Sequence, residues 1–145
     1  MSGEIELEVV TSTAVLLRDK ITDFYIPAYY GEAGVLSHHL PYLSVLKAGE
    51  VSYLDLAGYR HYLYIEGGFM EVKDDKIVLI VDGVEWGDEL DAEALKKRMS
   101  ETEKRIQSSF RGEITPDELA RELDRQRVLR LKLDIVRKAT ATKKE

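Results

Sequence analysis

Residues 4–9 read Glu-Ile-Glu-Leu-Glu-Val, a strict alternation of acidic and apolar side chains. Successive side chains of a β-strand point to opposite faces, so this pattern predicts a strand with one buried and one solvated face. Further apolar runs follow at residues 15–17, 21–26, 51–56, 59–65, 69–72 and 77–81. Short strands at intervals of about 8–12 residues indicate a β-sandwich or a barrel.

The charged residues, proline and glycines between these runs predict where the strands end. We expect the run at 15–17 to end at Arg18-Asp19 and the run at 21–26 to end at Pro27. Asp74-Asp75 is expected to form a turn, because short polar side chains tolerate turn conformations. Gly67-Gly68 is expected to form a turn or a bulge.

From Asp91 onward the apolar period becomes that of a helix. One helix face carries residues spaced by four, three and four positions: Leu95, Met99, Thr102 and Ile106. Asp91 is suited to cap the first amides of this helix, and Gly112 is suited to end the segment that follows it.

The segment Thr115-Pro116-Asp117-Glu118 predicts the start of a second helix. Thr115 is a favourable N-cap, proline fits the first helical position, and Glu118 completes a capping box. We expect this helix to run from about Pro116 to about Lys138. The short break before it predicts an antiparallel hairpin.

The second helix carries two adjacent apolar stripes. One consists of Val128, Leu131 and Ile135, and the other of Leu129, Leu133 and Val136. Three explanations remain open at this point: one broad core face, two neighbours at once, or different neighbours at different times.

The net charge of −6 conceals a strong asymmetry along the 145 residues. Residues 1–87 carry 6 basic and 14 acidic side chains, whereas residues 119–144 carry 9 basic and 3 acidic ones. An acidic body argues against nucleic acid as a partner, because phosphates repel it. The basic terminal segment favours an acidic partner surface.

The candidate residues for that contact lie on the second helix: Arg121, Arg125, Arg127, Arg130 and Lys132. An ordinary solvated helix face, with internal pairing such as Glu122 with Arg125, is the alternative. A membrane surface is less favoured, because the arginines are spread around the helix instead of gathering on one side.

Residues suited to catalysis or to cofactor binding are not arranged in any recognisable motif. The chain has no cysteine, which favours a reducing compartment, and no apolar run long enough to cross a bilayer. Its N-terminus lacks a signal pattern. No metal-ligand spacing, phosphate loop, dinucleotide fingerprint or nucleophile elbow occurs, so we expect no metal, no cofactor and no enzyme. These features predict a non-catalytic protein that works by binding partners.

Two segments carry a more specific pattern. Residues 31–51 read Gly-Glu-Ala-Gly-Val-Leu-Ser-His-His-Leu-Pro-Tyr-Leu-Ser-Val-Leu-Lys-Ala-Gly-Glu-Val, and residues 65–72 read Ile-Glu-Gly-Gly-Phe-Met-Glu-Val. The first resembles the G-E-x-G and H-x-P loop and strand of the epsilon subunits of F-type ATP synthases. The second is similar to the G-G-x-x-E-V segment of that family, which includes chloroplast epsilon and mitochondrial delta chains.

The resemblance implies a mainly β plus α fold. A flattened ten-stranded β-sandwich would occupy residues 1–87, and an antiparallel two-helix hairpin would occupy residues 88–145. The sandwich would bind the gamma subunit and the ring of c subunits. Gly31, Glu32 and His39 would meet the ring from a segment rich in turns.

The resemblance also implies a regulatory hairpin in the rotor stalk of a proton-translocating ATP synthase. The hairpin would extend along gamma and inhibit ATP hydrolysis by contacting the catalytic beta, and also alpha, subunits. Its place would be the cytoplasmic face of a bacterial inner membrane, held there indirectly through the complex.

One departure from the family concerns nucleotide binding. Some bacterial members bind ATP through an (I/L)-D-x-x-R-A motif, and here Leu90 and Asp91 match it, but Ala94 replaces the arginine. Because arginine would supply the charge-assisted contact, we assign no nucleotide site. A different class of protein, a free-standing β-sandwich ligand-binding module with a helical oligomerisation tail, is the alternative function.

Overall fold

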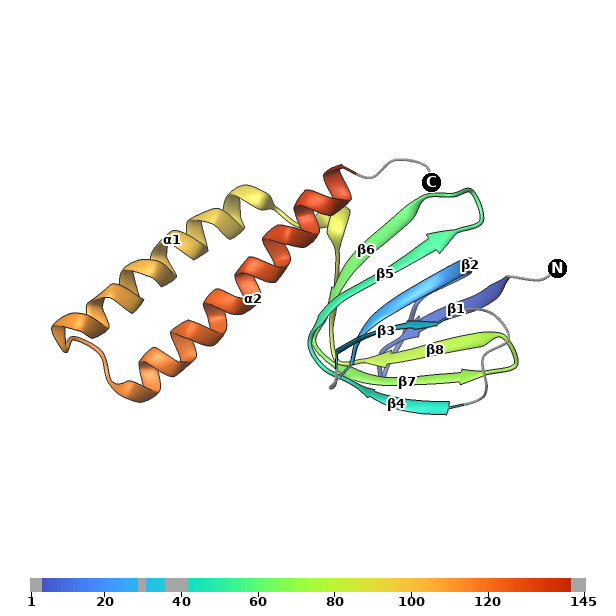
Figure 1. Ribbon diagram of the computed structural model, residues 1–145, viewed down its shortest axis with the longest axis horizontal. Coiled ribbons are helices and arrows are strands. Elements are labelled where there is room, and N and C mark those ends of the chain that lie inside the picture. Colours follow the sequence, from blue (N-terminus) through green and yellow to red (C-terminus); the bar gives the residue numbers. More distant parts are fainter. Residues whose placement is uncertain (1–3, 29–30, 36–41, 142–145) are drawn as a thin grey trace.

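The computed structural model describes residues 4–28, 31–35 and 42–141. In these ranges nine strands are followed by a two-helix hairpin (Figure 1). The strands are β1 (Ile5–Val10), β2 (Val15–Ala28), β3 (Gly31–Val35), β4 (Tyr42–Leu46), β5 (Gly49–Asp55), β6 (Arg60–Ile65), β7 (Gly68–Lys73), β8 (Lys76–Val81) and β9 (Val84–Trp86). The helical part consists of η1 (Gly87–Glu89), α1 (Ala92–Ser108), η2 (Ser109–Arg111) and α2 (Pro116–Thr140).

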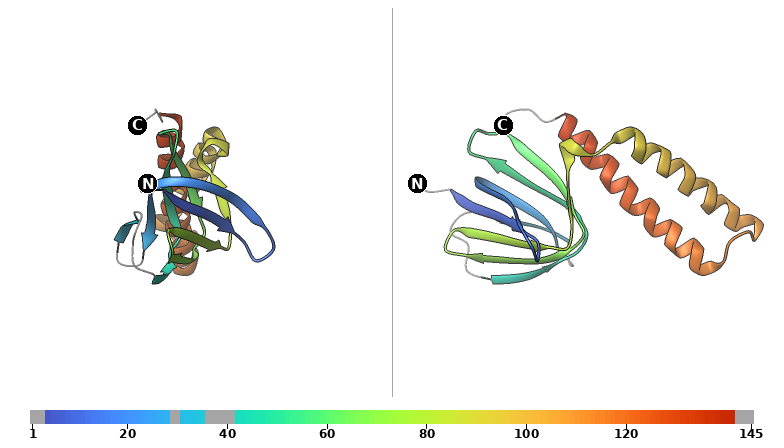
Figure 2. Two further views of the ribbon diagram at one scale, coloured as in Figure 1. Left: turned by 90° about the vertical axis from the view of Figure 1, so that its right-hand side faces the viewer. Right: turned by 180° about the vertical axis from the view of Figure 1, so that it is seen from behind.

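Strand β2 joins the two sides of the β-domain. It pairs with β1, which lies parallel to β8, and it also pairs with β3 and β5. The sheet continues from β8 through β7 to β4 on one side, and from β5 through β6 to β9 on the other. The strands therefore curl around a common interior, with the helices at one end (Figures 1 and 2).

The prediction that residues 15–17 and 21–26 form separate strands is wrong. Both runs belong to the 14-residue strand β2, which passes through Arg18-Asp19 and Pro27. Arg18 remains in the strand because it is paired with Glu8 of β1, and its side chain hydrogen-bonds that carboxylate at 2.7 Å. The described ranges contain nine strands, where the resemblance implied ten.

Two further strands were not predicted. The segment Gly31–Val35, expected to be rich in turns, is strand β3 and pairs with β2. The short strand β9 pairs with β6 at the position of Trp86. The Asp74-Asp75 turn is confirmed, because both residues have positive φ angles, at 53° and 58°.

The core of the β-domain is built from the alternation in β1. Ile5, Leu7 and Val9 are buried, as predicted, while Glu4 and Glu6 are exposed. The same interior receives side chains from six further strands, including Ile21, Phe24, Val51, Leu63, Met70, Ile77 and Leu79. Apolar burial of this extent is the main stabilising contribution to the β-domain.

The hairpin forms as its capping residues predict. The Asp91 carboxylate accepts hydrogen bonds from the backbone amides of Glu93 and Ala94. Gly112 ends the first helical segment in the left-handed conformation, with φ of 71°. The Thr115 hydroxyl then accepts a bond from the Glu118 amide at 3.1 Å. On α1 the predicted face is confirmed, with Leu95 and Thr102 buried.

Helix α2 has two neighbours at once, which is one of the three explanations left open for its stripes. Leu129 is buried and lines the groove between α1 and α2, together with Thr102. Ile135 is fully buried at the other end of the helix, where α2 contacts η1, β5 and β6. The rest of the hairpin projects away from the β-domain (Figure 1).

The close approach of α2 to the β-domain depends on Gly87. A Cβ atom at this position would lie 2.6 Å from the Tyr62 carbonyl oxygen and 3.1 Å from Cγ2 of Ile135. It would also lie 3.2 Å from Cβ of Ala139. No side chain fits between the β-domain and the last turns of α2.

Replacing Leu7 with alanine should reduce the free energy of unfolding by about 3 kcal/mol, because it leaves a cavity in the core. Urea titration followed by the fluorescence of Trp86, the only tryptophan in the chain, measures this. Leu16→Ala is the matched control, since Leu16 is 39% exposed, and should cost less than about 1 kcal/mol. Equal losses in the two variants would contradict the assignment of the core.

Replacing Gly87 with alanine should loosen α2 from the β-domain and cost about 1–3 kcal/mol, as overpacking does. Hydrogen exchange of the α2 amides after residue 130 measures the effect. Gly83→Ala is the control, because its new Cβ meets only the flexible end of the Glu66 side chain. Unchanged protection in Gly87→Ala would show that the contact tolerates a methyl group.

Candidate partner-binding surface on helix α2

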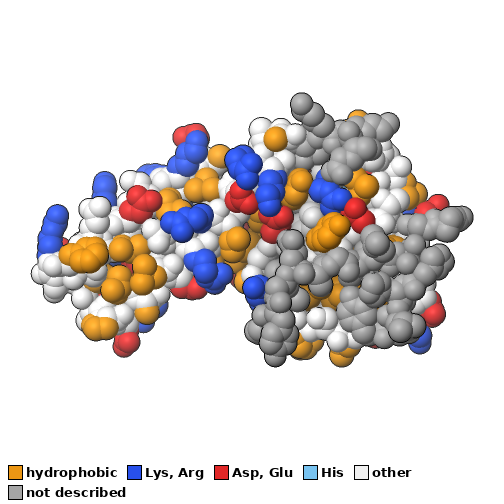
Figure 3. All heavy atoms as spheres, viewed as in Figure 1, with side chains coloured by type: hydrophobic (Ala, Val, Ile, Leu, Met, Phe, Trp, Pro, Cys, Tyr) orange, Lys and Arg blue, Asp and Glu red, His pale blue; other side chains and the backbone are white. Residues whose placement is uncertain are grey.

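The four predicted arginines are all exposed: Arg121, Arg125, Arg127 and Arg130. The first three lie on the half of α2 that is farther from the β-domain, and Arg130 lies just past the middle of the helix. Figure 3 shows basic side chains along the hairpin, outside the β-domain. Arg127 pairs with Asp124 at 2.9 Å within the helix. An exposed pair of this kind contributes little to stability, so Arg127 can exchange Asp124 for another acidic partner.

Glu122 ties the two helices together. Its side chain is only 5% exposed and receives Arg125 at 2.8 Å and Arg105 of α1 at 3.1 Å. The pairing with Arg125 was predicted from the sequence, but the contact with Arg105 was not. Within the described part of the chain, the other carboxylate oxygen, Oε1, has no hydrogen-bond partner. A buried carboxylate between two guanidinium groups is costly to separate from either, so it favours one register of the hairpin.

Lys132 differs from the four arginines, although the sequence grouped it with them. Its side chain is only 15% exposed, and its Nζ lies 2.6 Å from the Glu85 carboxylate of β9. The same amine lies 4.9 Å from the centre of the Tyr64 ring, within range of a cation–π contact. The structure thus places Lys132 against the β-domain.

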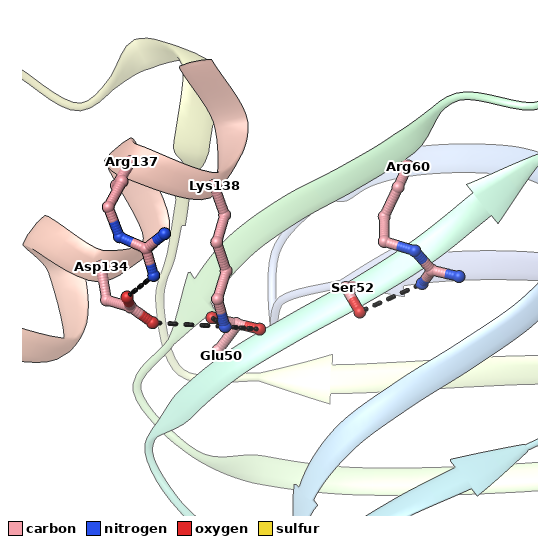
Figure 4. A network of polar contacts seen from close by, with 6 residues as sticks. All are labelled: Glu50, Ser52, Arg60, Asp134, Arg137 and Lys138. Atoms are coloured by element: carbon pink, nitrogen blue, oxygen red, sulfur yellow. Dashed lines mark hydrogen bonds and ion pairs between the residues drawn. The ribbon is translucent and has the colours of Figure 1, made fainter. Parts of the chain in front are cut away.

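A second lysine makes a similar contact further along α2. Lys138 Nζ donates to both carboxylate oxygens of Glu50, at 2.9 and 3.1 Å (Figure 4). It also lies 3.2 Å from Asp134, which pairs with Arg137. Burial lowers the pKa of the Lys138 amine, but the contacts with Glu50 and Asp134 together outweigh this effect, so the pKa is raised. The sequence analysis missed this residue as an intramolecular contact.

The residues predicted to face the c ring are described only in part. Gly31 and Glu32 lie in β3, where they are paired with Ala28 and Pro27 of β2. They therefore stand at a hairpin between two strands, where backbone pairing holds their position. His39 lies outside the described residues. The contact of these three residues with the ring stays a prediction.

The incomplete ATP motif has a structural role in this chain. The carboxylate of Asp91 is occupied as the N-cap of α1, and one of the amides it holds belongs to Ala94. Leu90 directly precedes this cap. The same cap would serve α1 with or without an arginine at position 94.

His61 is engaged by its own domain. Its ring stacks on Tyr53, with 4.8 Å between the ring centres, and its Nε2 lies 2.7 Å from Asp55. The hydrogen bond from His61 lowers the pKa of Asp55. Within residues 4–28, 31–35 and 42–141, no cluster of three potential metal ligands occurs. None of the helices in this part of the chain is long and apolar enough to span a bilayer.

Comparison with known proteins identifies the family. Residues 4–87 match the family described as the ATP synthase delta/epsilon chain β-sandwich domain. The epsilon chain of Nitratidesulfovibrio vulgaris is 34% identical over 97 residues, which cover 67% of this chain and 72% of that relative. The epsilon chain of Dehalococcoides mccartyi is 29% identical, with coverage of 90% and 92%.

Solved structures share the fold over nearly the whole chain, hairpin included. A chain of the Euglena gracilis mitochondrial ATP synthase superposes with a TM-score of 0.67 at 22% identity, covering 97% of this chain and 82% of its own length. A chain from the Tetrahymena thermophila central stalk and c ring gives 0.55 at 14% identity, with coverage of 91% and 96%. The match over residues 4–87 and the identity to curated epsilon chains show that the chain belongs to the ATP synthase delta/epsilon family, as a non-catalytic epsilon chain.

Proposed function

We propose that this epsilon chain is a rotor subunit that couples gamma to the c ring and restrains ATP hydrolysis through its hairpin. The β-domain is the fixed part, because its core and sheet pairing make it a stable unit. The hairpin is the moving part. It meets the catalytic beta and alpha subunits when it extends along gamma.

The observation that carries the inhibitory role is the position of the four arginines. All four are exposed, and all but Arg130 lie on the half of α2 that projects from the β-domain, where an acidic partner can reach them. Charge complementarity of this kind steers encounter and fixes register between partners. The hairpin meets the β-domain through the last turns of α2, so it can leave without disturbing the sheet.

The coupling role rests on β3 and the segment after it. Gly31, Glu32 and His39 match the family residues that face the c ring, and a carboxylate at position 32 can pair with basic loop residues there. Strand pairing with β2 gives Glu32 a fixed backbone, which suits a contact that transmits torque. In a bacterial cell the complex would hold this chain at the cytoplasmic face of the inner membrane.

A direct assay combines the chain with gamma and the catalytic head. It should co-purify with gamma and reduce ATPase activity, whereas a chain ending at residue 87 should keep gamma binding and lose inhibition. Failure of the full chain to bind gamma would overturn the proposal. Light scattering should give a monomer for the isolated chain. A stable homo-oligomer would favour the free-standing ligand module instead.

Replacing Arg121, Arg127 and Arg130 together with alanine should weaken inhibition roughly tenfold at low salt, since each exposed charge pair contributes up to about 1 kcal/mol. Arg125 is kept because it pairs with the buried Glu122. The deficit should shrink as salt screens the attraction. Concentration dependence of ATPase inhibition provides the measurement. The control changes Lys96, Lys97 and Arg98 of α1 to alanine, which removes the same charge from the other helix. Equal losses from both triple variants would refute a specific role for α2.

A further inference from the structure

Two of the cations on α2 are already held by acids of the β-domain. Lys132 contacts Glu85 at 2.6 Å, and Lys138 contacts Glu50 at 2.9 Å. Glu50 comes from β5 and Glu85 from β9, so the two contacts attach the helix to two strands on one side of the β-domain. We call this set of Glu50, Tyr64, Glu85, Lys132 and Lys138 the charge latch.

The two lysines of the charge latch flank the apolar contact between α2 and the β-domain. Ile135 stands between the two lysines in sequence and is fully buried against Gly87. Lys132 is three residues before Ile135 and Lys138 three residues after it, so all three lie on one helix face. The apolar contact alone is small, because one buried isoleucine contributes only about 1.5–3 kcal/mol. The two flanking ion pairs can each add up to about 1 kcal/mol, and they are the part of this contact that salt and charge changes can weaken.

We propose that the charge latch is the resting contact of the hairpin, so that Lys132 and Lys138 oppose inhibition while the arginines of α2 promote it. The acids of the β-domain occupy these two lysines whenever the hairpin is docked. An acidic surface on another subunit can reach them only after the latch has opened. This inference rests on the proposed inhibitory function and names what regulates it.

The assignment gives the two halves of one basic helix opposite effects. Removing an arginine from the projecting half lowers the affinity for the partner. Removing Lys132 lowers the affinity for the docked state instead, which raises the extended population. A uniform basic helix, by contrast, would lose inhibition with every cation removed.

Opening of the latch can be measured on the isolated chain, apart from any ATPase. The chain has no cysteine, so Ser100→Cys on α1 and Asp82→Cys after β8 provide two sites for spin labels. Double electron–electron resonance then reports the distance distribution between hairpin and β-domain. The labelled parent should show one dominant distance at low salt.

Glu50→Gln with Glu85→Gln should increase the open population, with roughly a fivefold change in the equilibrium for each pair lost. About 0.5 M NaCl should act in the same direction on the parent protein, because it screens the pairs. The matched control is Glu4→Gln with Glu71→Gln, which removes the same two negative charges from exposed positions of the β-domain. A charge swap, Glu50→Lys with Lys138→Glu, should restore the closed distance. Unchanged distances in the double variant would overturn the latch.

The second arm measures inhibition of the catalytic head. Glu50→Gln with Glu85→Gln leaves every cation of α2 in place, so it should strengthen inhibition. Lys132→Gln should also inhibit at least as strongly as the parent, while Lys97→Gln should have no effect. Weaker inhibition by Lys132→Gln, together with an unchanged distance distribution, would contradict the latch and show that Lys132 contacts the partner, as the arginines do. If the parent fails to inhibit at all, the proposed function fails, while the distance measurements still decide whether the latch exists.

Discussion

The fold depends on the continuous pairing of β2 with strands on both sides of the β-domain. Its first half lies beside β1, and its second half lies beside β3 and β5, with an irregular register between Ile21 and Asp23. The irregularity lies where β2 passes from its pairing with β1 to its pairing with β3 and β5, and such irregularities bend a strand locally. The core, the position of β3 and the seat for the hairpin all follow from it.

The β-domain and the hairpin are held together by different forces. The β-domain relies on a contiguous apolar interior, whereas α2 rests on one isoleucine, one glycine and a few ion pairs. Salt does not screen apolar contacts, but it does screen partly exposed ion pairs. The chain thus joins a part that should stay fixed under most conditions to a part whose docking can be adjusted.

Much of this arrangement could be predicted from the sequence, because the relevant signals are local. The alternation in β1, the Asp91 and Thr115 caps and the stop at Gly112 depend on neighbours within a few residues. The continuity of β2 could not be predicted, because a charged Arg18-Asp19 pair in mid-strand is stabilised by Glu8 on another strand. The sequence also could not show that Lys132 differs from the arginines. Its charge is visible in the sequence, but its contacts with Glu85 and Tyr64 depend on how α2 docks on the β-domain.

The small contact between the hairpin and the β-domain sets the timescale of undocking. Undocking breaks the contacts of two lysines and one isoleucine with the β-domain and no strand pairing, so it is a rigid-body motion. Motions of this class occur in microseconds to milliseconds, whereas opening the β-domain would require global unfolding. The hairpin should therefore equilibrate many times during the lifetime of the folded β-domain. Its position at any moment would then reflect the surrounding salt and partners, with no memory of how the chain was assembled.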